Sequence, residues 1–183
     1  MIITLTEASR LIRQGEIIAA PTEAVYGLSC DPGNESTLLQ LLALKRRPTE
    51  KGLIVVAADI HQLDPFVDWL LLTKSERQQL SSPSAMPITW VVPARTSVSR
   101  TLRGAFETIA VRVTTHPVMQ ALCRACKQPL VSTSANLSEK PPARTIMEIT
   151  QQFGQDFPVL VGELGALTAP TEIVDIRTMK KIR

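Results

Sequence analysis

The chain has 183 residues, of which 44% are hydrophobic, 20% are charged and only 4% are aromatic, with a formal net charge of +3. This composition is typical of a folded globule with its own core, and it excludes a disordered segment and a surface built mainly to stack nucleic-acid bases. No apolar run reaches the roughly 20 residues that cross a bilayer, and the three cysteines without a signal peptide predict a cytoplasmic protein.

The first quarter of the chain predicts a helix, two strands and a second helix. Thr6 is expected to cap a helix over residues 7–14, and a buried strand follows over 17–20. Asn34 is expected to cap the second helix, whose leucines repeat at helical spacing. Residues 45–47 are basic and end that helix, where positive charge is favourable.

The rest of the chain alternates short apolar runs with helical segments. Helical pieces are expected over 60–80, a helix over 116–127 with Thr115 as its N-cap, and another from Thr145 to about residue 153. A loop followed by a strand is expected over residues 22–28, and further strands over residues 53–57, 87–92, 109–113, 129–131, 159–161 and 173–176. This mixture predicts one α/β domain, residues 1–183, built on a single sheet.

Residues 129–136 change abruptly from an apolar run to hydroxyl and amide side chains. A strand that ends in this way places several hydrogen-bonding groups at the carboxyl edge of the sheet, where open α/β sheets usually hold ligands. The alternative is an ordinary strand-to-loop turn, in which Ser, Thr and Asn side chains bond their own backbone.

Several familiar catalytic patterns are absent from the sequence. It has no GxxxxGK[ST] phosphate loop, no GxGxxG and no GxSxG nucleophile elbow. The two histidines, His61 and His116, occupy expected cap or helix-start positions, so no Ser-His-Asp arrangement is indicated. Cys123 and Cys126 form a CxxC inside an expected helix without a second cysteine pair, which indicates packing residues and no metal site.

Cations and small hydroxyl residues at the ends of strands and helices remain as candidates for a site. They are Thr22, Lys45, Arg47, Thr89, Ser132, Thr133 and Ser134. Arg112 interrupts an apolar strand, where burial without an anionic partner would be costly. Such a set can hold phosphates and a carboxylate but offers no obvious general base, which favours phosphoryl or nucleotidyl transfer. Capping threonines and solvated surface cations remain the alternative.

Six segments, in order, resemble the YrdC-like family, specifically its short bacterial members. They are Pro-Thr-Glu-Ala-Val-Tyr-Gly-Leu at 21–28, Lys-Arg-Arg-Pro at 45–48, Pro-Ile-Thr-Trp at 87–90, Ala-Val-Arg-Val at 110–113 with His116-Pro117, Leu-Val-Ser-Thr-Ser-Ala-Asn at 130–136, and Pro-Thr-Glu-Ile-Val-Asp at 170–175. Each segment alone is unspecific, but together they extend over nearly the whole chain.

The resemblance implies a twisted mixed sheet with flanking helices around a concave basic groove. It also implies a reaction of L-threonine, bicarbonate and ATP that gives threonylcarbamoyl-adenylate and pyrophosphate, for threonylcarbamoyl modification of an adenosine in tRNA. ATP is therefore expected as a substrate accompanied by Mg²⁺. The implied partners are tRNA in the basic groove and the downstream tRNA threonylcarbamoyl-transfer proteins, with no membrane.

The resemblance also implies roles for individual residues. Four are expected to face the nucleotide and carry catalysis: Lys45, Arg47, Ser134 and Asn136. Two more are expected near ATP: Thr89 and Arg183. Four are expected to bind threonine: Thr22, Arg112, Ser132 and Thr171.

The chain departs from the family pattern where glycines are usual. Ser29 and Glu139 replace glycines, Ala85-Met86 replaces Pro-Gly, and the glycine-rich run before Pro170 is thinned. Lost glycines can change how closely the backbone approaches a ligand. Two other functions therefore stay open: a non-catalytic RNA or tRNA-binding module that uses the same basic groove, and a domain that acts on another acyl or carbamoyl group.

Overall fold

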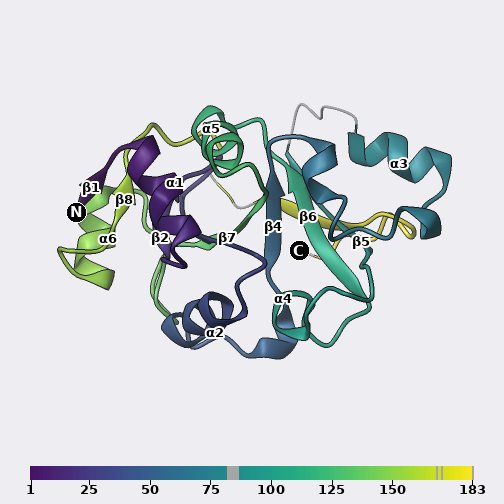
Figure 1. The fold of residues 1–183 in the computed structure, drawn as a ribbon, viewed down its shortest axis with the longest axis horizontal. Helices are drawn as coiled ribbons and strands as arrows, with labels where there is room; N and C mark the ends of the chain where they lie inside the picture. Colours follow the sequence, from purple (N-terminus) through teal and green to yellow (C-terminus); the bar gives the residue numbers. More distant parts are fainter. Residues whose placement is uncertain (82–86, 168, 170, 183) are drawn as a thin grey trace.

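The computed structural model describes residues 1–81, 87–167, 169 and 171–182, and these form one mixed sheet with helices on both faces (Figure 1). The strands, in chain order, are β1 (Ile2–Ile3), β2 (Ile18–Pro21), β3 (Tyr26–Cys30), β4 (Ile54–Ala57), β5 (Ile88–Pro93), β6 (Thr108–Val113), β7 (Leu130–Ser134), β8 (Val159–Leu160) and β9 (Glu172–Asp175). Their spatial order is β1-β8-β2-β3-β7-β4-β6-β5-β9. The β2/β3, β3/β7, β7/β4 and β6/β5 pairs are antiparallel and the other neighbours are parallel. The predicted α/β class with a mixed sheet is confirmed.

Helices fill the connections between these strands. They are α1 (Leu5–Arg13), α2 (Glu35–Leu44), α3 (Lys74–Ser81), α4 (Arg100–Arg103), α5 (Pro117–Cys126) and α6 (Ile146–Phe153). Short 3-10 helices occupy Thr49–Lys51, Ile60–Leu63 and Trp69–Leu71. The expected helical pieces over 60–80 correspond to two of these turns followed by α3.

The first helix begins earlier than the sequence predicted. Thr4, and not Thr6, is its N-cap, because Thr4 and Glu7 form a capping box. The Glu7 backbone N–H donates to Thr4 Oγ1 at 3.3 Å, and Glu7 Oε2 accepts from the Thr4 backbone N–H at 2.7 Å. These hydrogen bonds hold the pKa of the Glu7 carboxyl below its usual value.

The predicted caps of the other helices were right in two cases out of three. Asn34 caps α2 and Thr145 caps α6, as expected. The prediction for α5 was wrong, since His116 and not Thr115 is the N-cap. Pro117 is the first helical residue, where its missing N–H costs nothing, and this makes the residue before it the cap.

Alternate strand residues face two separate cores. On one face α1 and α5 pack together, and their core includes Ala8, Ile12, Ile18, Ala20, Val56, Met119, Leu122, Cys123 and Leu130. On the other face the core includes α2 and α6 side chains with Ala19, Leu28, Leu38, Leu41, Val55, Val131 and Ile149. Val55 and Val131 belong to one core, whereas their chain neighbours Val56 and Leu130 belong to the other. This is the period-two alternation of a sheet that is buried on both sides.

The cysteines are packing residues, as predicted. Cys30, Cys123 and Cys126 are free and buried. Burial raises the pKa of Cys123 to about 12 and that of Cys126 to about 11, so neither thiol is a thiolate at neutral pH.

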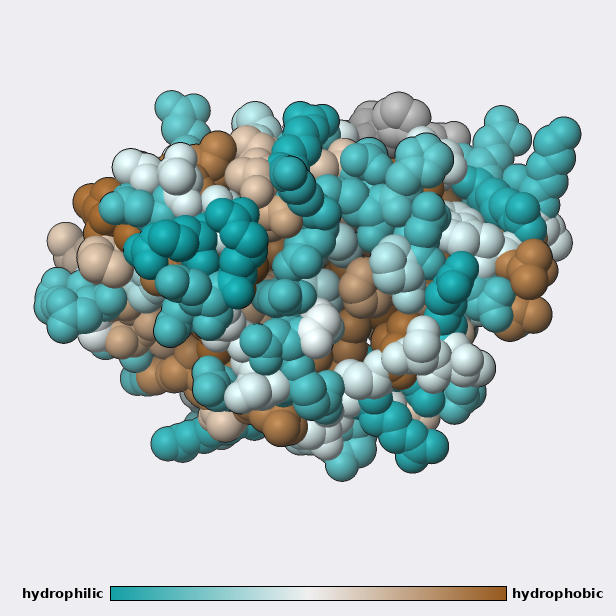
Figure 2. Space-filling model, in the orientation of Figure 1, coloured by the Kyte–Doolittle hydropathy of each residue, from teal (hydrophilic) through white to brown (hydrophobic). Residues whose placement is uncertain are grey.

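The surface shown in Figure 2 is mostly hydrophilic, with apolar side chains in small separate areas. Exposed large apolar residues come from distant parts of the chain, among them Ile2, Leu70 and Met147. Within the described residues, no helix combines the length and apolar composition that crossing a membrane requires.

Candidate functional site

A cavity of about 790 Å³ lies on the sheet face that α1 and α5 cover only in part. The β4/β6 register pairs Val56 with Arg112, so the Arg112 side chain leaves the sheet on the α5 side. By the same alternation, further cavity-lining side chains on three strands lie on this face: Ile54, Ala110, Ser132 and Ser134. The cavity therefore lies on the same face of the sheet as the core of α1 and α5, beyond the part that these helices cover.

The polar end of β7 belongs to the sheet itself. A strand over 129–131 with hydroxyls at its edge was expected, but β7 continues through Ser134 because it pairs with β3. Ser132 lies opposite Ser29, and Ser134 lies opposite Gly27. A Cβ on Gly27 would lie 2.8 Å from Ser132 Oγ, so the missing side chain leaves room for this hydroxyl.

The end of α2 places the basic residues at one end of the cavity. Arg46 has a φ of 48°, the left-handed conformation that ends many helices. The Arg46 N–H donates to Ala43 O at 3.0 Å and the Arg47 N–H to Leu42 O at 2.9 Å. This Schellman motif turns the chain sharply, so that Lys45 and Arg47 both line the cavity.

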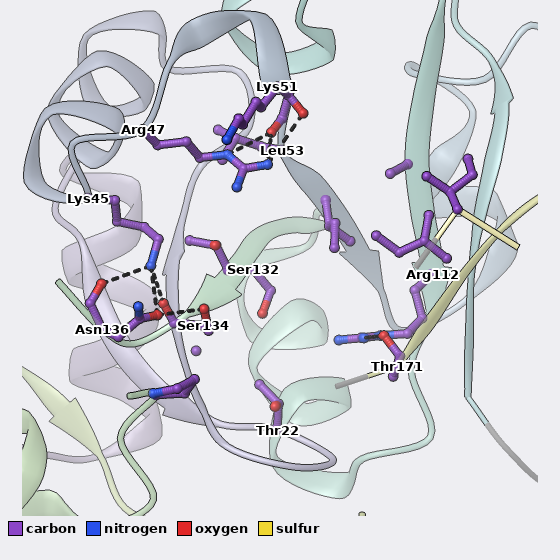
Figure 3. A pocket seen from close by; sticks show the side chains of 18 of the residues that line it. Thr22, Lys45, Arg47, Lys51, Leu53, Arg112, Ser132, Ser134, Asn136 and Thr171 are labelled. Carbon is purple, nitrogen blue, oxygen red and sulfur yellow. Dashed lines mark hydrogen bonds between the residues drawn. The ribbon is translucent and has the colours of Figure 1, made fainter. Parts of the chain in front are cut away.

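Lys45 joins α2 to the end of β7 (Figure 3). Its Nζ donates to Ser134 O at 2.5 Å, to Asn136 O at 2.9 Å and to Asn136 Oδ1 at 3.1 Å. Ser134 Oγ also donates to Asn136 Oδ1, at 2.7 Å. The Asn136 amide nitrogen donates to Leu137 O and Lys140 O, both at 3.0 Å, which fixes the amide orientation.

The environment of Lys45 weakens its hold on a proton. Burial, and secondarily the nearby Arg47 charge, lowers the pKa of Lys45 to about 8. The side chain is thus a cation at neutral pH that an incoming anion would stabilise.

Arg47 is held against the turn that follows α2. Its Nη2 donates to Gly52 O at 2.8 Å and its Nε to the same oxygen at 3.1 Å. Gly52 has a φ of 59°, and a Cβ there would lie 2.8 Å from Arg103 O. Only glycine fits this close approach to the backbone of Arg103. The approach fixes the position of Gly52 O, and the hydrogen bonds to that oxygen orient the Arg47 guanidinium.

A buried polar cluster forms another part of the cavity wall, around Arg112 (Figure 3). Arg112 Nη1 donates to Thr171 Oγ1 at 2.7 Å, and Nη2 lies 3.2 Å from Glu23 Oε2. Both charged side chains are 8% exposed. A buried Arg112 was expected to need an anionic partner, and Glu23 is that partner.

Glu23 lines the cavity but was not among the predicted site residues. It belongs to the Pro21–Leu28 motif, and its acidic side chain was the available signal, but nothing local pairs it with Arg112. Glu23 Oε1 accepts from Thr114 Oγ1 at 2.6 Å, so the carboxylate is bound on both sides. An ion pair with added hydrogen bonds can be tolerated in a buried position.

The turn that carries Thr22 and Glu23 is attached to a later segment of the chain. Gly165 N–H donates to Thr22 O at 2.9 Å, and Leu167 N–H donates to Glu23 O at 3.0 Å. A Cβ on Gly165 would lie 2.5 Å from Glu23 O. Thr22 Oγ1 donates to Val25 O at 2.7 Å, which closes the turn.

Nine of the ten predicted site residues lie in the described part of the chain, and eight line the cavity: Thr22, Lys45, Arg47, Arg112, Ser132, Ser134, Asn136 and Thr171. Thr89 is fully buried behind them, with its hydroxyl 3.0 Å from that of Thr171. Its expected contact with ATP stays a prediction. Arg183, like Ala85-Met86 and Pro170, is outside the described residues.

The described lining residues include six cations and three carboxylates. The cations are Lys45, Arg46, Arg47, Lys51, Arg103 and Arg112, and the carboxylates are Glu23, Glu139 and Asp175. Among the described residues, no three His, Cys, Asp or Glu side chains gather as a metal-binding group. The arrangement can hold anions at Lys45 and a carboxylate at Arg112.

Comparison with protein families and curated proteins gives one consistent relationship. The Sua5/yciO/yrdC family model, described as "Telomere recombination", matches residues 10–183. A threonylcarbamoyl-AMP synthase from Serratia proteamaculans (strain 568) is 51% identical over 168 residues, which cover 92% of this chain and 89% of that protein. A threonylcarbamoyl-AMP synthase from Yersinia enterocolitica is 49% identical over 179 residues, 98% of this chain and 94% of that protein.

The fold is also shared with solved structures. The crystal structure of P. abyssi Sua5 complexed with L-threonine superposes with a TM-score of 0.86 at 25% sequence identity. The match covers 96% of this chain and 54% of that one, so this chain spans about half the length of that protein.

Proposed function

The chain belongs to the Sua5/yciO/yrdC family, and from this membership we propose that it is a threonylcarbamoyl-AMP synthase. It would convert L-threonine, bicarbonate and ATP into threonylcarbamoyladenylate and pyrophosphate. The observation that carries the proposal is the 51% identity to a threonylcarbamoyl-AMP synthase over 92% of the chain. The cavity, with an amino-acid end at Arg112 and an anion end at Lys45, supports it.

The Arg112 end would bind threonine. Arg112 and Thr171 would take the carboxylate, with Thr22 and Ser132 close to the rest of the amino acid, since all four line the cavity. Thr89, whose expected contact with ATP stays a prediction, would also support Thr171 through the hydrogen bond between their hydroxyls. Discrimination against serine would depend on one methyl group, which is worth about 1–3 kcal/mol, so serine should be a poor but measurable substrate.

The Lys45 end would bind the phosphates of ATP. Threonine's amine would add to carbon dioxide with loss of a proton, or to bicarbonate with loss of water, to form a carbamate. A carbamate oxygen would then attack the α-phosphorus as pyrophosphate leaves. Lys45 and Arg47 would stabilise the negative charge that develops on the phosphates, and Ser134 and Asn136 would orient them by directional hydrogen bonds. The expected contact of Arg183 with ATP stays a prediction, because Arg183 is outside the described residues.

Mg²⁺ would enter this site as part of the ATP substrate. Since no metal-binding group of three protein side chains is found in the described residues, phosphate oxygens would supply most of its ligands. When bound, it would add positive charge at the phosphates.

The product of this reaction leads to tRNA modification, so further partners follow. We expect the adenylate to be passed to the tRNA threonylcarbamoyl-transfer proteins in the cytoplasm. The cationic lining residues also keep tRNA as a candidate ligand, and filter binding of tRNA against salt concentration would test it, because phosphate contacts weaken as salt rises. We rank a non-catalytic RNA-binding module, or action on another carbamoyl group, below the synthase.

A substrate-dependence panel tests the proposed function. Purified protein with ATP and Mg²⁺ should release pyrophosphate only when both threonine and bicarbonate are present, and more slowly with serine. Mass spectrometry should identify threonylcarbamoyladenylate in the complete reaction. Pyrophosphate release that ignores threonine, or no release at all, would reject the synthase.

A further inference from the structure

Lys45 and Arg112 line the same cavity on opposite sides of the view in Figure 3, and they differ in how their charges are compensated. Arg112 is paired with the Glu23 carboxylate, at 3.2 Å between Nη2 and Oε2. Lys45 Nζ is bonded to three neutral oxygens, and no carboxylate of the described residues lies within ion-pair distance of it. One end is a neutral pair and the other retains a net positive charge.

The Glu23 carboxylate is held in place by the protein's own groups. Thr114 Oγ1 donates to Oε1 at 2.6 Å, and Arg112 faces Oε2. The backbone on the same residue is tied down by Leu167 N–H, which donates to Glu23 O at 3.0 Å. The carboxylate is thus fixed beside the Arg112 guanidinium.

We propose that Glu23 is a specificity-determining residue that assigns the two ends of the cavity to different anions. By compensating Arg112 it makes that end acceptable to the single carboxylate of a zwitterionic amino acid and repellent to a polyphosphate. The triphosphate of the nucleotide is thereby directed to Lys45. This inference rests on the proposed function, since it identifies how the same cavity separates its two substrates.

The physical reason is the difference in charge between the two ligands. A polyphosphate at Arg112 would bring several negative charges close to the Glu23 carboxylate in a poorly solvated position, where like-charge repulsion is large. An amino acid carries one carboxylate and a compensating ammonium group. Without Glu23, Arg112 would be an uncompensated buried cation that attracts polyphosphate, and its guanidinium would no longer be held in the direction that the threonine carboxylate needs.

Glu23→Gln tests this by removing the charge and keeping the shape. Isothermal titration with inorganic tripolyphosphate should show one binding event in the wild-type protein, unaffected by saturating threonine. In the Glu23→Gln protein a second tripolyphosphate site should appear, and threonine should compete for it. Threonine affinity should fall on the order of ten- to a hundredfold, because Arg112 loses the partner that positions it. Glu163→Gln, an equal change of charge on an exposed side chain, should behave as wild type.

Two outcomes would overturn the proposal: unchanged threonine affinity in Glu23→Gln, or loss of affinity without any competing tripolyphosphate site. If Glu23→Gln does not fold, Thr114→Val replaces it, which keeps the charge and removes the donor to Oε1. It should weaken threonine binding severalfold and create no tripolyphosphate site, and unchanged threonine binding would reject the proposal. These titrations need no turnover, so wild-type protein that binds both ligands separately but releases no pyrophosphate would reject only the proposed function.

Discussion

Lys45 Nζ donates to both oxygens of Asn136, at 2.9 Å to the main chain and 3.1 Å to the side chain. A third bond, to Ser134 O, uses the last ammonium hydrogen. Lys45 thus positions the turn after β7 as well as placing a charge there. A phosphate that binds at Lys45 would either replace one of these oxygens as a hydrogen-bond acceptor or be attracted by the ammonium charge without a direct hydrogen bond.

Lys45→Ala should lower the rate of threonine-dependent pyrophosphate release by about 10²–10³-fold, as loss of one preorganised charge-stabilising group usually does. Asn136→Ala, which keeps the charge and removes one acceptor, should cost less. Lys74→Ala, on the exposed start of α3, is the matched control and should leave the rate unchanged. Equal rates for Lys45→Ala and Lys74→Ala would contradict a role for Lys45.

The lowered pKa of Lys45, about 8, predicts a pH dependence of nucleotide binding. ATP affinity should fall as pH rises through about 8, because the neutral amine no longer attracts phosphate. Below that pH the group is already charged, so binding takes up fewer protons. Calorimetric titration of ATP in two buffers of different ionisation enthalpy should therefore show more proton uptake at pH 8.5 than at pH 7.2, and equal uptake would contradict this prediction.

The same group affects folding with a defined sign. Its pKa is about 8 in the folded protein and near 10.5 when exposed, so the unfolded chain binds more protons between these values. The contribution of Lys45 to stability should accordingly rise with pH between about 8 and 10.5. Urea unfolding at several pH values in this interval tests the prediction. The free energy of unfolding should rise more with pH for the wild-type protein than for Lys45→Met, which has no titrating group at this position.

Much of the element order could be predicted from sequence because each element carries a local signal. The leucine spacing and Asn34 cap of α2 are read from ten residues, and they were right. β1 was missed, since two residues, Ile2–Ile3, carry no period. The early start of α1 depends on a reciprocal pair, Thr4 with Glu7, which a search for one capping residue overlooks.

The residues of the candidate site, too, could be predicted only where a local sequence motif contains them. Lys45 and Asn136 were predicted from motifs that resemble a family, and they do lie together. The pairing of Glu23 with Arg112 could not be predicted, because it is created by the sheet register and by the fastening of the Thr22–Glu23 turn to the segment around Gly165. Charge pairs between distant residues leave no periodic trace in a sequence.

Glu139 provides a stability test, because it is a residue with a side chain whose backbone φ is positive. Its φ is 66°, a left-handed conformation that costs a side-chain-bearing residue about 1–2 kcal/mol. Glu139→Gly removes this cost, but the extra conformational entropy of the unfolded chain offsets about 0.4–1 kcal/mol of the gain, so the protein should be stabilised by about 0 to 1.6 kcal/mol. Glu163→Gly, at a position without positive φ, should only destabilise, and thermal unfolding of both variants makes the comparison. Equal losses would contradict strain at Glu139.

Gly165→Ala tests the attachment of the Glu23 turn. A Cβ on Gly165 would lie 2.5 Å from Glu23 O and 2.7 Å from Glu23 Cα, so the backbone of one segment must move. Displacement of Glu23 would disturb Arg112, and the KM for threonine should rise about tenfold or more while the KM for ATP changes little. Overpacking should also cost about 1–3 kcal/mol of stability.

Gly33→Ala is the control for that variant, because a Cβ there would meet only Asp31 Oδ1, at 3.3 Å, in an exposed turn. Steady-state kinetics with each substrate varied in turn would separate the two KM values, and thermal unfolding would report stability. A Gly165→Ala protein with both KM values raised equally would show general disruption of the cavity. An unchanged threonine KM would mean that the segment around Gly165 does not position Glu23.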